Sequence, residues 1–195
     1  MIKNIVLDMG KVLLNYDPYV ILNKVCDTDE EKAIIDRELF NGKEWIMGDY
    51  GELKNAERFD GVSKRVPEHL HDKLREVVDN WDICMSPVDG AKEFCRLAKE
   101  KGYKVYVLSN ACNKFHEYFP KNYDVDFFDG IVVSSDVHTI KPEPEIYKYL
   151  FNKYELVPEE CLFIDDREEN VNGAKAVGMQ GVIFTNNYDE IAKMI

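Results

Sequence analysis

Short apolar segments alternate with helix-like segments along most of the chain, and this alternation constrains the fold more than any other feature. The apolar segments lie at residues 5–7, 103–108, 127–133, 161–164 and 181–184. Predicted helices lie between them at residues 89–101, 144–154 and 171–177, and a further helix is expected to end near residue 119. Strands separated by helices form parallel βαβ units. The pattern therefore predicts an α/β protein with a doubly wound parallel sheet.

The segment from Asn15 to Met85 has little strand character and is predicted to form several helices. They are expected at residues 18–26, 28–39, 53–59 and 67–81, with a turn at residues 45–49 after a short helix. Thr28 is a favourable N-cap, and the acidic residues that follow it lie near the positive end of the helix dipole. The pattern leaves two interpretations open: an ordinary helical bundle, or a helical cap inserted over an active site.

Composition and charge narrow the classes of function. The 195 residues suit one domain, or a core with a smaller insert. The net charge of −12, without a dense cluster of Lys and Arg, argues against binding to nucleic acid or to acidic membranes. No run approaches the ~20 apolar residues that span a bilayer, and no secretion signal is recognisable. Five cysteines without a Cys-x-x-Cys pair fit reduced thiols, so we expect a cytoplasmic protein.

Polar residues recur where the predicted strands end. They are Asp8 after the first strand, Ser109 and Asn110 after the second, Lys141 in the loop after the third, and Asp165 and Asp166 after the fourth. Because the carboxyl ends of parallel strands share one edge of the sheet, the fold would bring these side chains together. Each has an ordinary structural explanation, such as an N-cap or a stiff loop, but four such features at one edge favour a functional site.

This set of residue types suits an anionic phosphoryl group and a divalent metal. Mg²⁺ binds oxygen ligands and typically uses one or two carboxylates, which Asp8 and Asp166 would supply, with Asp165 behind them. Lys141 would neutralise phosphoryl oxygens and keep Asp8 ionised. The Ser109 hydroxyl and the backbone N–H of Asn110 would donate to the same oxygens. Carboxylates are established nucleophiles that form aspartyl phosphates.

The motifs resemble those of the haloacid dehalogenase (HAD)-like hydrolase superfamily. The matching segments are Ile5–Val12, Val107–Asn110, Ile140–Tyr147, and Leu162–Asp166 with Asn170. The sequence is most similar to the branch of bacterial sugar-phosphate phosphatases of the glucose-1-phosphatase type and the phosphatase domain of soluble epoxide hydrolase. This resemblance implies a Rossmann-like core of residues 1–14 and 86–195, with a helical cap domain at residues 15–85.

The resemblance also implies a role for each matching residue. Asp8 would be the nucleophile and a metal ligand, and Lys141 would stabilise the phosphoryl group. The other implied roles are phosphate binding by Ser109 and Asn110, and Mg²⁺ binding by the Gly10 carbonyl, Asp166 and, behind it, Asp165.

The chain departs from most phosphatases of the family at Gly10. The common pattern has a second Asp at this position, which acts as general acid and base, and glycine cannot transfer a proton. The glucose-1-phosphatase-like branch is similar in having Gly here, so Asp17 or a group on the cap is expected to take the role. Lys11 is also unusual, and we expect it to face solvent.

The resulting hypothesis is Mg²⁺-dependent hydrolysis of a small phosphomonoester, such as a sugar phosphate, through an aspartyl-phosphate intermediate. One alternative is a 2-haloacid dehalogenase, which needs no metal, so the Asp165–Asp166 pair argues against it. Another is a non-catalytic phosphate-binding protein, against which Asp8 and Lys141 together argue. Aromatic candidates for a wall facing the substrate are Tyr16, Trp45 and Tyr50, although core packing is favoured for Trp45.

Overall fold

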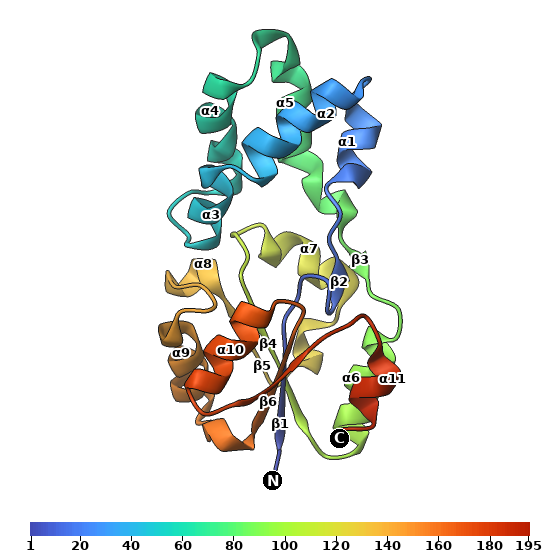
Figure 1. The fold of residues 1–195 in the computed structure, drawn as a ribbon, viewed down its shortest axis with the longest axis vertical. Coiled ribbons are helices and arrows are strands. Elements are labelled where there is room, and N and C mark those ends of the chain that lie inside the picture. The colour runs from blue at the N-terminus through green and yellow to red at the C-terminus, as the bar shows by residue number, and fades with distance from the viewer.

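A five-stranded parallel sheet forms the centre of the computed structural model, which describes residues 1–195 (Figure 1). Across the sheet the strands follow the order β5 (Gly130–Val133), β4 (Lys104–Ser109), β1 (Asn4–Leu7), β6 (Cys161–Asp165) and β7 (Gln180–Ile183). The chain adds strands on both sides of β1, whose four residues are all buried. The predicted α/β fold with a doubly wound parallel sheet is confirmed.

Helices cover both faces of this sheet. They are α6 (Ala91–Glu100), α7 (Phe115–Asn122), α8 (Ser134–Val137), α9 (Pro144–Tyr154), α10 (Glu168–Ala176) and α11 (Tyr188–Ala192). Ile5 and Leu7 of β1 share a core cluster with apolar residues of α6, α7 and α11. Val6 points to the other face, where it shares a second cluster with residues of α9 and α10. The alternation of side chains along β1 therefore builds two apolar layers.

The register of the sheet aligns the ends of the strands that carry the candidate residues. Leu7 lies opposite Val107 of β4 and Ile164 of β6. The N–H of Asp8 donates to the Ile164 carbonyl at 2.9 Å, which continues this pairing by one residue. Asp8 and Asp165 therefore leave the sheet side by side, as the strand pattern predicted.

The segment of residues 16–85 is mostly helical and lies beyond the carboxyl ends of the strands (Figure 1). Its helices are α1 (Tyr19–Val25), α2 (Asp29–Ile35), α3 (Lys43–Asp49), α4 (Arg58–Val62) and α5 (His71–Asn80). A π-helical turn at Asp36–Phe40 follows α2, and short 3₁₀ helices of this segment lie at Asn55–Glu57, Ser63–Arg65, Glu68–Leu70 and Trp81–Cys84. Two further 3₁₀ helices, Val125–Phe127 and Pro158–Glu160, belong to the part of the chain around the sheet. None of the helices combines the length and apolar composition that crossing a membrane requires.

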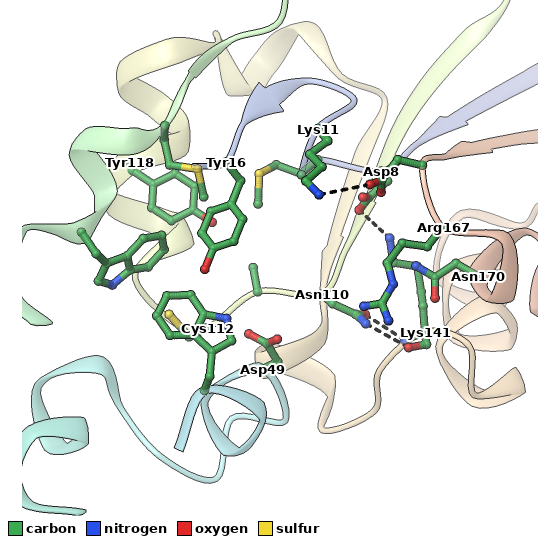
Figure 2. Close-up of a pocket in the computed structure, with 17 residues that line it drawn as sticks. Asp8, Lys11, Tyr16, Asp49, Asn110, Cys112, Tyr118, Lys141, Arg167 and Asn170 are labelled. Atoms are coloured by element: carbon green, nitrogen blue, oxygen red, sulfur yellow. Dashed lines mark hydrogen bonds and ion pairs between the residues drawn. The ribbon is translucent and has the colours of Figure 1, made fainter. Parts of the chain in front are cut away.

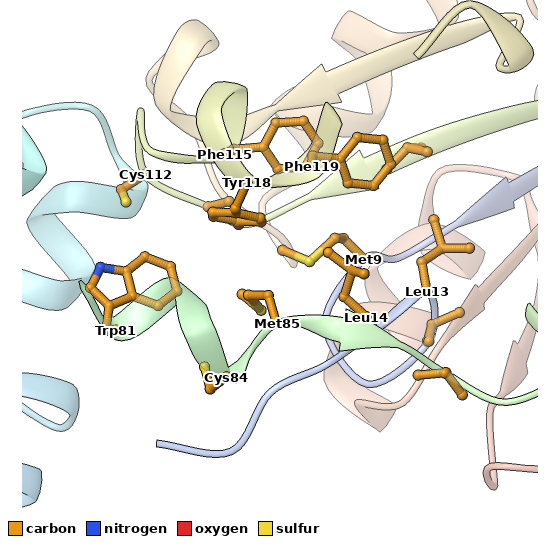
Figure 3. Packing of buried hydrophobic residues seen from close by; sticks show 14 of the residues in the cluster. Met9, Leu13, Leu14, Trp81, Cys84, Met85, Cys112, Phe115, Tyr118 and Phe119 are labelled. Atoms are coloured by element: carbon orange, nitrogen blue, oxygen red, sulfur yellow. The ribbon is translucent and has the colours of Figure 1, made fainter. Parts of the chain in front are cut away.

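Two short strands connect this helical segment to the sheet. β2 (Leu14–Asn15) and β3 (Ser86–Pro87) pair in antiparallel fashion where the chain enters and leaves the segment. Around them one apolar cluster continues without a break. Figure 3 shows Met85 beside Leu14 and Met9, with Trp81 further into the helical segment. The helices are thus anchored to the sheet by apolar packing as well as by the backbone.

Some local predictions were wrong. Residues 45–49 were expected to form a turn after a short helix, yet they belong to α3. A Cβ atom at Gly48 would lie 2.2 Å from Nη2 of Arg58, so the glycine allows close packing of that side chain. The apolar run at 127–133 forms a strand only from Gly130. The helix predicted from Pro67 becomes α-helical only at His71, after a 3₁₀ turn.

Replacing Leu150 with alanine should destabilise the protein by about 3 kcal/mol, because a fully buried leucine leaves a cavity. Leu150 lies on the inner side of α9, remote from the strand ends. Its neighbour Tyr149 on the same helix is 41 % exposed, so Tyr149→Ala should change stability by less than about 0.5 kcal/mol. Urea unfolding monitored by circular dichroism measures both. Equal losses for the two variants would contradict the packing described for α9.

Candidate active site

A buried lysine lies between two buried aspartates at the carboxyl edge of the sheet. Nζ of Lys141 is 2.5 Å from Oδ1 of Asp8 and 2.7 Å from Oδ2 of Asp165. The side chains of Lys141, Asp8 and Asp165 are 1 %, 10 % and 0 % exposed. Charges this deeply buried persist only when they are paired and hydrogen-bonded. The three side chains therefore form one electrostatic unit.

The ionisation of this unit is set by burial and by mutual attraction. Burial raises the pKa of Asp8 to about 7, against the opposing attraction of Lys141, and the neighbouring Asp165 raises it further. Burial alone would lower the pKa of Lys141, but the charges of Asp165 and Asp8 outweigh it and leave that pKa raised. The lysine thus stays protonated, and an additional positive charge near Asp8 would favour its carboxylate form.

Three carboxyl groups lie close together at this edge, near the single ammonium group of Lys141. Oxygen atoms of Asp8, Asp165 and Asp166 all lie within 4.8 Å of one another. Asp165 already accepts hydrogen bonds from Lys141, from the Arg167 N–H and from the Asn170 amide. Asp166 accepts none from these groups and its side chain is 22 % exposed. Asp8 and Asp166 are therefore the carboxylates that fit a hard divalent cation such as Mg²⁺, and Asp165 positions Lys141 behind them.

The asparagine after β4 fixes the loop that carries the lysine. The Asn110 amide donates to the Lys141 carbonyl at 2.9 Å and accepts from the Lys141 N–H at 2.8 Å. These two hydrogen bonds hold the Lys141 loop against the end of β4. Ser109 is fully buried, its hydroxyl has no hydrogen-bond partner, and it does not line the cavity described below. Phosphate binding by Ser109 and Asn110 remains a prediction, as does the metal-binding role of the Gly10 carbonyl.

A cavity of about 370 Å³ opens above these residues, between the edge of the sheet and the helical segment (Figure 2). Its floor includes Asp8, Lys141 and Asp166. Its opposite wall carries aromatic side chains, which are Tyr16, Trp45, Trp81 and Tyr118. The rings of Trp45 and Trp81 lie 4.9 Å apart in an edge-to-face arrangement. Trp45 therefore both packs in the core and faces the cavity, whereas the sequence favoured packing alone.

The structure places several candidate residues at positions that differ from those expected from the sequence. Asp17 is exposed, accepts a hydrogen bond from the Tyr19 N–H and does not line the cavity, so its closeness to Asp8 along the chain is misleading. The Tyr50 hydroxyl lies outside the cavity as well, bonded to Glu143. Lys11 is 63 % exposed, as expected, yet it lines the cavity rim, and its Nζ lies 4.0 Å from Asp166.

Two charged cavity residues were missed by the sequence analysis. Asp49, at the end of α3, and Arg167, after β6, both line the cavity (Figure 2). Arg167 follows the Asp165–Asp166 pair directly, so its position at the strand end was a usable signal. Asp49 is remote from every strand end in the sequence, and only the packing of α3 brings it over the sheet.

Comparison with known proteins identifies a matching family and several similar enzymes. The family described as haloacid dehalogenase-like hydrolase matches residues 2–178. The chain is 26 % identical to a sesquiterpene phosphatase from Aspergillus oryzae, over 95 % of this chain and 91 % of that protein. It is 28 % identical to a D-ribitol-5-phosphate phosphatase from Bacteroides thetaiotaomicron, over 92 % and 90 %. A HAD family enzyme from Bacteroides thetaiotaomicron, solved with magnesium and inorganic phosphate, superposes with a TM-score of 0.75 at 26 % identity, covering 96 % of both chains.

Replacing Asp166 with asparagine should weaken binding of Mg²⁺ by about tenfold or more, because a carboxylate ligand becomes a neutral amide. Isothermal titration calorimetry with MgCl₂ measures this without reference to any reaction. Glu168→Gln is the matched control, since Glu168 is exposed in the first turn of α10. Equal affinity in the two variants would show that Asp166 does not hold the ion.

Proposed function

The chain belongs to the haloacid dehalogenase-like hydrolase family, and we propose that it is a Mg²⁺-dependent phosphatase that hydrolyses a small phosphomonoester. The observation that carries the proposal is the Asp8–Lys141–Asp165 unit at the floor of the cavity, with Asp166 beside it. A carboxylate, a fixed ammonium group and a second carboxylate for a cation meet the needs of phosphoryl transfer. Similarity to two phosphatases over nearly the whole chain supports the same reaction class.

The proposed reaction begins with Asp8. Its carboxylate attacks the phosphorus atom, the ester P–O bond breaks, and the phosphoryl group is carried on Asp8 until water hydrolyses it. Lys141 keeps Asp8 ionised and offsets charge on the phosphoryl oxygens, and Asn110 holds the Lys141 backbone in place. Asp8 and Asp166, with the Gly10 carbonyl, would hold Mg²⁺, which when bound neutralises charge between the nucleophile and the phosphate.

The alcohol part of the substrate is proposed to lie against the aromatic wall. Tyr16, Trp45 and Trp81 all belong to the segment of residues 15–85, which we propose acts as a cap domain that excludes water from the reaction. Aromatic rings pack favourably against apolar surfaces, including the apolar faces of small sugars and alditols. The two relatives named as phosphatases act on a sesquiterpene phosphate and on ribitol 5-phosphate, so the alcohol varies within this fold. The cavity volume of about 370 Å³ limits it to a small molecule.

The purified protein should release p-nitrophenol from p-nitrophenyl phosphate in the presence of Mg²⁺, and EDTA should reduce the rate at least about tenfold. Adding excess Mg²⁺ should restore the activity. Chloride release from 2-chloropropionate serves as the control for a dehalogenase. A phosphatase rate that EDTA does not change, or chloride release without phosphatase activity, would contradict the proposal.

Asp8→Asn should lower phosphatase turnover by about a thousandfold or more, because an amide cannot act as the nucleophile. Asp17→Asn removes a nearby exposed carboxylate and should leave turnover unchanged. Steady-state assays with a panel of phosphorylated metabolites measure both, and a thermal melt verifies that each variant is folded. Undiminished turnover in Asp8→Asn would refute the proposed chemistry.

A further inference from the structure

Asp49 presents an unpaired carboxylate to the cavity from the side opposite Asp8. It is the last residue of α3 and lines the cavity together with Asp8 and Lys141 (Figure 2). Its side chain is partly buried and forms neither a hydrogen bond nor an ion pair with the rest of the chain. A carboxylate in such a position costs desolvation energy without a compensating partner inside the protein. It is therefore available to a group bound in the cavity.

The backbone around Asp49 is fixed to the core. The Ser134 hydroxyl donates to the Asp49 carbonyl at 2.6 Å, and Nδ1 of His138 lies 2.9 Å from the Tyr50 carbonyl. The next residue, Gly51, has a φ of +72°, and a Cβ there would lie 2.2 Å from the Ser135 carbonyl oxygen. The end of α3 thus rests on the start of α8 (Figure 1). This contact sets the position of the Asp49 carboxylate relative to the Lys141 loop.

Positive groups approach Asp49 from three elements, but none forms an ion pair with it. They are Arg58 of α4, Lys141 after β5 and Arg167 after β6. Arg58 is fully buried against the Trp45 ring, with its guanidinium carbon 4.0 Å from the ring centroid. The other titratable groups around the carboxylate are Tyr16, Cys112 and Tyr118.

Burial dominates this environment. It raises the pKa of Asp49 to about 7, although Arg58, Lys141 and Arg167 all act to lower it. A carboxyl group with a pKa close to neutral is populated in both its acid and its carboxylate form at physiological pH. General acid–base catalysis requires such a group within reach of the reacting atoms.

We propose that Asp49 is the general acid and base of the hydrolysis, in the place of the acid that Gly10 lacks. The inference rests on the phosphatase activity proposed above. As Asp8 attacks phosphorus and the ester P–O bond breaks, the Asp49 carboxyl group gives its proton to the departing alcohol oxygen. The Asp49 carboxylate then takes a proton from the water that attacks the phosphorus of the phosphorylated Asp8. The bond between phosphorus and Asp8 breaks, phosphate leaves, and Asp49 is again protonated.

The test compares Asp49→Asn with the wild-type protein on two aryl esters of similar shape, phenyl phosphate and p-nitrophenyl phosphate. The phenolate leaving group needs a proton as it departs, because phenol has a pKa of about 10, whereas p-nitrophenolate is a much better leaving group. In single-turnover experiments with Mg²⁺, Asp49→Asn should slow phenol release at least about tenfold more than p-nitrophenol release. Steady turnover of p-nitrophenyl phosphate should slow after one equivalent is released, because water is no longer activated.

The pH profile gives an independent readout. The rate with phenyl phosphate should fall in the wild-type protein as the pH rises through about 7, because the acid form of Asp49 is lost. This decline should be absent in Asp49→Asn and retained in Asp49→Glu, which keeps a carboxyl group. Asp60→Asn, an exposed acid on α4, is the matched control and should behave as the wild type.

Equal slowing of both esters by Asp49→Asn, with the alkaline decline retained, would overturn the role of Asp49 as an acid. It would show that the residue only positions the substrate or stabilises the segment. Wild-type protein that cleaves neither ester would instead refute the proposed phosphatase activity. Circular dichroism and thermal melts of each variant separate loss of folding from loss of proton transfer.

Discussion

The ion pairs of Lys141 with Asp8 and Asp165 are the interaction on which the rest of the site depends. A buried ammonium group is tolerated only because two carboxylates and a fixed loop surround it, and removing one partner of such a group costs about 3–5 kcal/mol. The parallel register brings Asp8 and Asp165 together, while Asn110 holds the Lys141 backbone and Asn170 holds Asp165. The sheet therefore supplies a rigid charged floor before any substrate or cation arrives.

The two parts of the chain divide the requirements of the site between them. The strand ends provide charge, and in the proposed reaction their residues would bind the groups that every phosphomonoester shares. The helical segment provides ring surfaces and Asp49, which line the cavity and would face the part of a substrate that differs from one phosphomonoester to another. The apolar cluster around Met85 and the β2–β3 pair joins the two parts, so the wall is held over the floor by packing as well as by the connecting backbone.

The residues at the strand ends could be predicted from the sequence because local pattern determines their position. A buried apolar run followed by Asp8, or by Asp165 and Asp166, places these side chains at one sheet edge whatever the surrounding helices do. The helical segment offered no comparable rule. Residues 45–49 were predicted to form a turn, whereas they are helical, and the small size of Gly48 allows the buried Arg58 side chain to pack against this helix. The position of Asp49 depends on that tertiary contact and on the contact between α3 and α8. Neither contact can be read from the local periodicity of the sequence.

A proton-transfer group on the helical segment would change how the reaction is controlled. An acid at position 10 would stand permanently beside the nucleophile, on the same loop. Asp49 instead lies on the helical segment, where Ser134 contacts its carbonyl and His138 contacts that of Tyr50. If the segment closes over the substrate, closure and completion of the catalytic set would be one event, because the closing segment would carry the proton donor. The phosphorylated Asp8 would be hydrolysed efficiently only in the closed state, so water entering an open cavity would meet no base to activate it. Glycine at position 10 is thus compatible with catalysis, provided that the helical segment contributes chemistry as well as enclosure.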